Sequence, residues 1–175
     1  VLVPNHVNLI NDINIISIYW LYDDGGVTIL IGYLLTLSPK WKQHKIRVMA
    51  LDCLGFDDCN KLVCLMNKLR INCEIVSVKN NDIDIDQNMN DNDHENDINF
   101  PISEFADEKL KKYKYVGKCI ERHSSSSSLC IITLPFPRQD YKWWEYQQII
   151  QSLTPRSCPS VFVRGNQEQM LCYTL

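Results

Sequence analysis

Apolar and polar positions alternate along the chain in blocks that predict strands and helices in turn. The segment from Ile15 to Leu21 is almost continuously apolar, which is typical of a strand covered on both faces of a parallel sheet. Lys45 to Leu51 and Cys73 to Val78 are further predicted strands. One helix is predicted for residues 27–37, before a proline, and a second begins at about Asp58, where apolar residues recur at three- and four-residue spacing.

The second half of the chain repeats this alternation after a polar interruption. Asparagine and aspartate dominate from Asn80 to Asn99, a composition that predicts a solvated, disordered insert. The serine run from Ser124 to Ser128 predicts a linker or loop, with phosphorylation as the alternative. The elements predicted around it are a helix capped by Ser103, a strand from Leu129 to Phe136, a helix capped by Asp140, and two strands at Ser160–Val163 and Met170–Thr174.

The spacing in the last predicted helix also assigns its inner face. The residues expected there are Trp143, Tyr146, Ile149, Ile150 and Leu153. Trp143 and Trp144 are adjacent and point about 100° apart on a helix, so we expect one to pack inward and the other to be a candidate partner anchor.

Strands that alternate with helices predict an α/β fold with a mostly parallel sheet, helices on both faces and a C-terminal β-hairpin at one edge. We predict a lead-in at residues 1–13 and a βαβαβ half at residues 14–79. The predicted insert covers residues 80–100, and residues 101–175 are predicted to form an αβαββ half of the same domain.

Composition narrows the class of protein. The 175 residues are 45% hydrophobic and 22% charged, and the net charge of -3 argues against a nucleic-acid or anionic-membrane partner. The longest uncharged apolar stretch, 27–37, is shorter than the roughly 20 residues of a membrane helix. Because the chain begins with Val1 and nothing there resembles a targeting peptide, we expect a fragment of a longer protein.

No pattern in the chain predicts a metal ion, a cofactor or a catalytic site. The eight cysteines form no Cys-x-x-Cys pair, and several lie within apolar runs, so we expect reduced, structural thiols. Residues 82–93 have acidic spacing similar to a calcium loop, but Gln87 and Asp93 occupy the positions that require glycine and glutamate. The four histidines are scattered, without partners at the spacing of a triad.

The junction Asp23-Asp24-Gly25-Gly26 is the one motif at a position where α/β folds bind ligands, beyond the carboxyl end of a strand. Neither Gly-x-Gly-x-x-Gly nor Gly-Lys-Ser/Thr is present, and two aspartates would repel phosphate. A tight, capped turn is the favoured interpretation and a ligand site is the alternative.

Two stretches resemble a known family. "IYWLYDDGGVTILIGYLLTLSPKWKQHKIRVM", from Ile18 to Met49, is similar to a block in the C-terminal domain of cation-chloride cotransporters. "SLCIITLPFPR" together with "PSVFVRGNQEQMLCYTL" resembles the closing sequence of the same proteins. Asp-Asp-Gly-Gly and Asn166-Gln167-Glu168 are most like the sodium-dependent branch, Na-K-Cl or Na-Cl.

The resemblance implies the cytosolic regulatory and dimerisation part of an electroneutral sodium-(potassium-)chloride symporter of the plasma membrane, with a fold like that of universal stress proteins. It implies no ion-binding residues here, since in this family ions bind between membrane helices. Its implied partners are the parent's transmembrane domain, a second copy of the chain and regulatory kinases. Arg164, Gly165 and Asn166 are family-motif residues without an assigned role, and the resemblance implies that the four junction residues are a structural turn.

Three other interpretations stay open. The chain could instead belong to the potassium-chloride branch of the same family. A free-standing nucleotide-binding module would have a similar fold, although the "PFPRQD" segment after Leu134 lacks the glycines of a phosphate loop. An enzyme would need a site assembled in space near Asp23 and Asp24.

Overall fold

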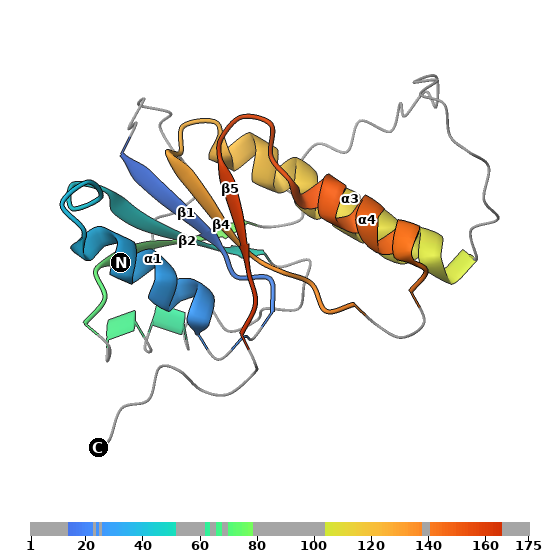
Figure 1. The fold of residues 1–175 in the computed structure, drawn as a ribbon, viewed down its shortest axis with the longest axis horizontal. Helices are drawn as coiled ribbons and strands as arrows, with labels where there is room; N and C mark the ends of the chain where they lie inside the picture. The colour runs from blue at the N-terminus through green and yellow to red at the C-terminus, as the bar shows by residue number, and fades with distance from the viewer. Residues whose placement is uncertain are drawn as a thin grey trace, which may run out of the picture.

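A computed structural model of the chain describes residues 14–22, 24, 26–51, 62–63, 66–67, 70–78, 104–137 and 141–165 (Figure 1). Strands and helices alternate through these residues, and short helical pieces at 62–63 and 66–67 lie between the second and third strands. The elements are β1 (Ile15–Tyr19), α1 (Val27–Leu37), β2 (Lys45–Leu51), β3 (Cys73–Val78), α3 (Glu104–Ser124), β4 (Leu129–Thr133), α4 (Trp143–Leu153) and β5 (Ser160–Val163).

The five described strands form one sheet in the order β3-β2-β1-β4-β5, and every neighbouring pair is parallel. In the register, Ile18 of β1 lies beside Val48 of β2 on one side and Ile131 of β4 on the other. The predicted α/β fold with helices on both faces is therefore confirmed. The predicted closing strand at 170–174 lies outside the described residues.

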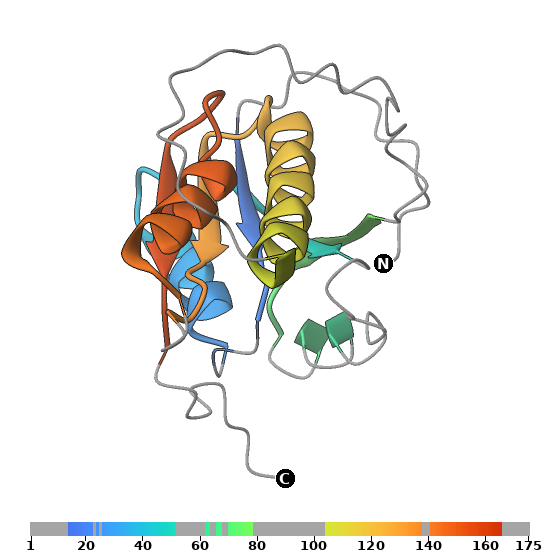
Figure 2. The same ribbon diagram turned by 90° about the vertical axis from the view of Figure 1, so that its right-hand side faces the viewer.

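The central strands are apolar throughout because both faces of the sheet are covered. All five residues of β1 and of β4 are buried. On one face, Tyr19 and Ile132 pack with Ile120 of α3 and Leu153 of α4, and on the other Ile18 packs with α1. Figure 2 shows α3 and α4 together in front of the sheet. This two-sided burial explains why the strands lack the apolar-polar alternation of half-exposed strands.

The serine run is more than the predicted linker. Ser124 is the last residue of α3 and is buried, and its hydroxyl forms a 2.8 Å hydrogen bond with the Tyr19 hydroxyl of β1. Ser127 forms a 2.7 Å hydrogen bond with Ser17, which is also buried in β1. These serines supply partners for the two polar side chains of the central strand, as buried polar groups require.

Two details of α4 differ from the sequence prediction. The helix begins at Trp143 with Lys142 at the N-cap, where the Glu145 carboxylate accepts the Lys142 N–H at 3.1 Å, so the cap is not Asp140. Trp143 is 71% exposed, whereas Ile149 and Leu153 are buried. The 100° step of a helix places Trp143 at the border of the face that these two residues define, which is why it does not pack inward.

Candidate functional site

The strand order reverses between β1 and β4, and the chain leaves these two strands in opposite directions across the sheet. In open α/β sheets, ligands bind beyond the carboxyl ends of strands at such a switch point. Asp24 follows β1 there and Thr133 ends β4. The sequence motif after β1 therefore lies where a ligand site of this fold class would be built.

The Asp24 side chain is buried and is held by four hydrogen bonds from the chain itself. Oδ1 accepts the Gly26 N–H at 3.0 Å and the Trp20 indole N–H at 3.2 Å. Oδ2 accepts the Thr28 N–H at 2.9 Å and also the Thr28 hydroxyl. A carboxylate offers about four acceptor positions, so this one is fully used. Two of its donors are N–H groups at the start of α1, which the helix itself leaves unpaired.

Gly26 completes the turn because its backbone takes a conformation that other residues disfavour. It is the N-cap of α1 and has φ 84°, in the left-handed region. A side chain there would place Cβ against the following carbonyl, at a cost of about 1–2 kcal/mol.

Thr133 joins the turn to the neighbouring strand. Its hydroxyl donates to the Tyr19 carbonyl at 3.2 Å and accepts the Leu21 N–H at 3.3 Å, and it lies 3.4 Å from the Thr28 hydroxyl. The end of β1, the start of α1 and the end of β4 are thus held by one buried polar group. Sequence reasoning did not single out Thr133 or Thr28, although Thr133 is the one polar residue in the run "LCIITL".

The second sequence motif meets the first in space. An added Cβ at Gly165 would lie 2.1 Å from the Asp24 carbonyl oxygen, so the chain leaving β5 passes directly against the turn after β1. The Arg164 guanidinium lies 4.0 Å from the centre of the Phe136 ring, beyond the end of β4. Of the predicted motif residues, Asp24, Gly26, Arg164 and Gly165 are brought together, whereas Asp23, Gly25 and Asn166 lie outside the described residues.

Little space remains between these groups. The cavity at the switch point has a volume of about 80 Å³, against about 300–1,000 Å³ for ordinary small-molecule sites. Its lining residues are Tyr22, Asp24, Thr133, Leu134, Phe136, Arg164 and Gly165. The Tyr22 hydroxyl is hydrogen-bonded to that of Tyr113 in α3, and burial raises the pKa of Tyr22 above its ordinary value. Tyr22 therefore stays a neutral phenol.

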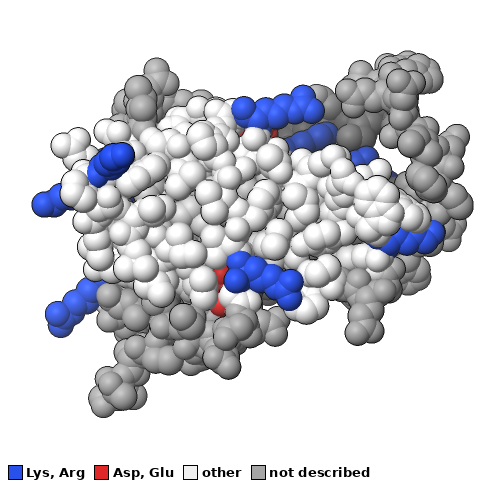
Figure 3. Space-filling view, viewed as in Figure 1, with Lys and Arg blue, Asp and Glu red and all other residues white. Residues whose placement is uncertain are grey.

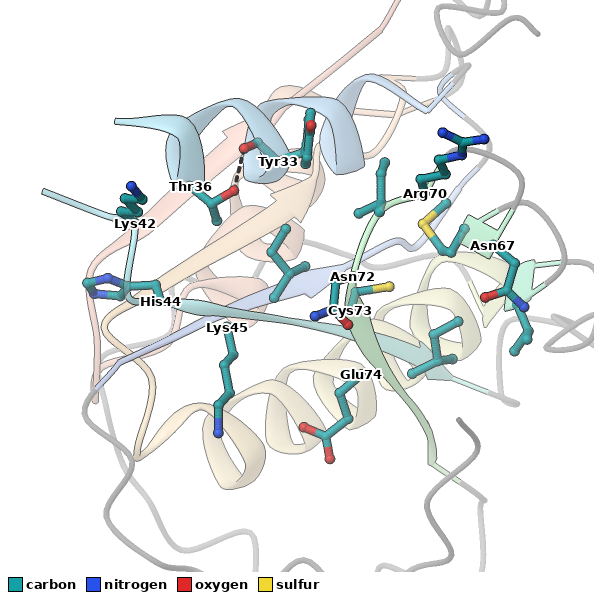
Figure 4. Close-up of a pocket in the computed structure, with 15 residues that line it drawn as sticks. Tyr33, Thr36, Lys42, His44, Lys45, Asn67, Arg70, Asn72, Cys73 and Glu74 are labelled. Carbon is teal, nitrogen blue, oxygen red and sulfur yellow. Dashed lines mark hydrogen bonds between the residues drawn. The ribbon is translucent and has the colours of Figure 1, made fainter. Parts of the chain in front are cut away.

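A larger cavity of about 830 Å³ lies at the opposite, amino end of β2 and β3 (Figure 4). Tyr33 and Thr36 of α1 lie above it, and Lys42 and Arg70 flank it from separate loops. Glu74, the one carboxylate among the described lining residues, is paired with Arg47 at 2.8 Å.

Among the described residues that line this larger cavity, no set of groups is arranged for catalysis. His44 lines it, but its Nδ1 is buried without a hydrogen-bond partner, and its ring packs 4.6 Å from that of Trp41. Burial raises the pKa of the Cys73 thiol, which disfavours its nucleophilic form. In the part of the chain that the structure describes, no group of three or more His, Cys, Asp or Glu side chains is placed to hold a metal ion.

Comparison with known proteins identifies relatives for nearly the whole chain. The family profile described as "SLC12: Solute carrier family 12" matches residues 10–99 and 79–174. Solute carrier family 12 member 2 of Mus musculus is 29% identical over 194 aligned positions, covering 91% of this chain and 16% of the relative. Member 3 of Homo sapiens is 29% identical, with 90% and 18% covered, and member 1 of Homo sapiens is 27% identical, with 90% and 17% covered. The chain thus spans under a fifth of the length of these relatives.

Proposed function

The chain belongs to solute carrier family 12, the cation-chloride cotransporter family, and from that premise we propose that it is the C-terminal cytosolic regulatory and dimerisation part of an electroneutral sodium-(potassium-)chloride symporter. The observation that carries the proposal is the coverage of the alignments. Nine tenths of this chain match 16–18% of each transporter, so most of the relative's length, where the membrane-spanning part would lie, has no counterpart here.

Two structural features support the proposal that this part of the transporter does not itself move ions. Among the described residues, no helix is long and apolar enough to cross a bilayer. The buried carboxylate at the switch point, that of Asp24, has its acceptor positions filled by protein donors. We therefore assign ion binding to the membrane part of the parent and a structural role to the Asp24 turn.

The geometry of the switch point argues against the nucleotide-binding alternative. An adenine nucleotide needs several hundred Å³ of space and exposed N–H groups for its phosphates. Here the cavity measures about 80 Å³, and the Gly26 and Thr28 N–H groups already donate to Asp24. A bound nucleotide would have to displace the buried Asp24 carboxylate, and the negative charge of that carboxylate would repel its phosphates.

A second copy of the chain is the partner that we propose for the face formed by α1, β5 and α4. In the view of Figure 1 these elements lie toward the reader, and Figure 3 shows mostly uncharged atoms there, with most Lys and Arg at the margins and one basic side chain beside acidic atoms below the middle. β5 is the end strand of the described sheet. The exposed large apolar side chains of the described residues include Leu34 and Leu37 on α1, Trp143 on α4 and Val161 on β5. Low charge with aromatic and aliphatic side chains is typical of the centre of an interface.

Light scattering after size-exclusion chromatography tests the dimer. We expect twice the chain mass of 20.4 kDa for the native chain and a monomer for the double variant Leu37→Asp/Val161→Asp. Asn67→Asp, an exposed change away from this face, is the matched control and should remain a dimer. A native chain that is monomeric at all concentrations, or a double variant that remains dimeric, would overturn the assignment of this face.

A further inference from the structure

Two cysteines that are distant in sequence meet beneath α4. Cys130 is the second residue of β4 and is fully buried, and Cys158 is in the segment between α4 and β5 and is 9% exposed. Their sulfur atoms are 3.0 Å apart. The Cys130 N–H donates to the Pro159 carbonyl at 2.9 Å, which fixes the segment that carries Cys158 against β4. A disulfide needs S–S ≈ 2.05 Å, so a shift of about 1 Å would bring the two atoms to bonding distance.

We propose that Cys130 and Cys158 form an oxidation site, in which a peroxide-class oxidant converts the two thiols into a disulfide that ties the α4 crossover to the sheet. The thiolate sulfur attacks one oxygen of hydrogen peroxide, the O–O bond breaks, that oxygen stays on sulfur as a sulfenic acid, and the other oxygen takes up a proton and leaves as water. The second thiol then attacks that sulfur, and a second water leaves. In sum, two thiols and one peroxide give one disulfide and two waters, so two electrons and two protons pass from sulfur to the peroxide oxygens.

The surroundings of the two thiols assign their order of reaction. Cys158 is the more accessible of the pair. Burial raises the pKa of both thiols, and the hydrogen bond between them raises that of Cys130 further but lowers that of Cys158, which is still raised overall. Cys158 is therefore the thiol that meets peroxide first, and Cys130 is the thiol that closes the disulfide. Because burial disfavours the thiolate, the reaction is slow at neutral pH and accelerates by roughly tenfold per pH unit while the thiol form dominates.

The disulfide would close a ring that contains all of α4. The two cysteines are 28 positions apart, and α4 lies between them. The same segment is already held on its other side, where the Arg156 N–H donates to the Glu121 carboxylate of α3 at 2.7 Å. Oxidation would therefore fix α4 to both the sheet and α3. Cross-linking a ring of this length restricts the unfolded chain, so we expect Tm to rise by about 5–10 °C in a way that reductant reverses.

Peptide mapping tests the proposal without relying on any variant. The purified chain is incubated with hydrogen peroxide at pH 7 and pH 8, quenched, alkylated with N-ethylmaleimide and digested with trypsin without reductant. Cleavage at the flanking arginines leaves Cys130 in peptide 123–138 and Cys158 in peptide 157–164, each with a single cysteine. We expect a linked pair of these peptides, lighter by two hydrogens than their sum, that forms faster at pH 8. Alkylated Cys130 and Cys158 in a sample whose other thiols are oxidised would overturn the proposal.

Variants then separate this pair from the remaining thiols. Cys158→Ala should leave Cys130 alkylated on unfolding and remove the rise in Tm with peroxide. Cys119→Ala, a change to another buried thiol in the same core, should leave the linked peptide in place, and circular dichroism confirms that each variant is folded. Cys130 linked instead to a third cysteine in the native chain would show that the 3.0 Å contact does not direct the reaction.

Discussion

Asp24→Asn tests whether the carboxylate organises the junction of β1 and α1. The amide keeps the shape of the side chain but presents an NH₂ group to one of two donor pairs, either Gly26 and Trp20 or the two donors of Thr28. The Thr28 hydroxyl can rotate to accept from the amide, which leaves the Thr28 backbone N–H as the group that must lose its partner.

The cost follows from these contacts. A buried N–H without a partner costs about 1–3 kcal/mol, and each remaining hydrogen bond loses the extra strength that a charged acceptor gives. We expect the free energy of unfolding to fall by about 3 kcal/mol, which corresponds to a drop in Tm of roughly 6–12 °C for a chain of this length.

Urea denaturation followed by circular dichroism measures this change against a matched control. Glu74→Gln also removes one negative charge, but its carboxylate is partly open to solvent and pairs with a single partner, Arg47, with side-chain exposures of 33% for Glu74 and 13% for Arg47. Such a pair contributes about 1 kcal/mol or less. If Asp24→Asn costs no more than Glu74→Gln, the carboxylate does not hold the turn and the structural interpretation is wrong.

Three further changes test the surrounding structure. Gly165→Ala places Cβ 2.1 Å from a backbone oxygen and should lower the free energy of unfolding by more than about 2 kcal/mol. In the same urea titration Gly32→Ala should cost less, because its Cβ meets the end of a flexible isoleucine side chain. Thr133→Val keeps the shape of the side chain but removes the hydroxyl that pairs with the Tyr19 carbonyl at the end of β1 and with the Leu21 N–H just beyond it. We expect the free energy of unfolding to fall by about 2 kcal/mol, and an unchanged urea midpoint would contradict this role of Thr133. Burial raises the pKa of the Cys130 and Cys158 thiols above the ordinary 9.0, so the unfolded chain loses these protons at a lower pH than the folded chain does. The free energy of unfolding should therefore fall above pH 9 by about 1.4 kcal/mol per pH unit for each thiol. Cys130→Ala should reduce that slope, and an equal slope would refute the raised pKa of Cys130.

Local periodicity was sufficient to predict most of the individual elements. The helix predicted at 27–37 has those bounds, and the strands predicted at 45–51 and 73–78 match β2 and β3, because two-sided burial leaves continuous apolar runs between turn residues. The run from Ile15 to Leu21 extends two residues beyond β1, since buried residues continue past the last paired position.

Contacts between distant segments were not accessible to the same reasoning. Nothing in the periodicity places β4 beside β1, and hence Thr133 beside the turn after β1. The approach of Gly165 to Asp24 joins residues from opposite ends of the described chain. Ser124 looked like part of a linker because serine is common in loops, whereas its role depends on the buried Tyr19 hydroxyl of another strand. These features arise from the strand order, which the sequence pattern leaves open.

Chloride-dependent uptake of sodium, in cells that express the parent protein, tests the central claim most directly. The parent is compared with a version that ends before Asn14 of this chain, with equal amounts at the cell surface. We predict chloride-dependent sodium uptake by the intact parent and a marked reduction without this chain, although the membrane part is unchanged. A parent that supports no chloride-dependent uptake, or one whose uptake is the same with and without these residues, would contradict the account.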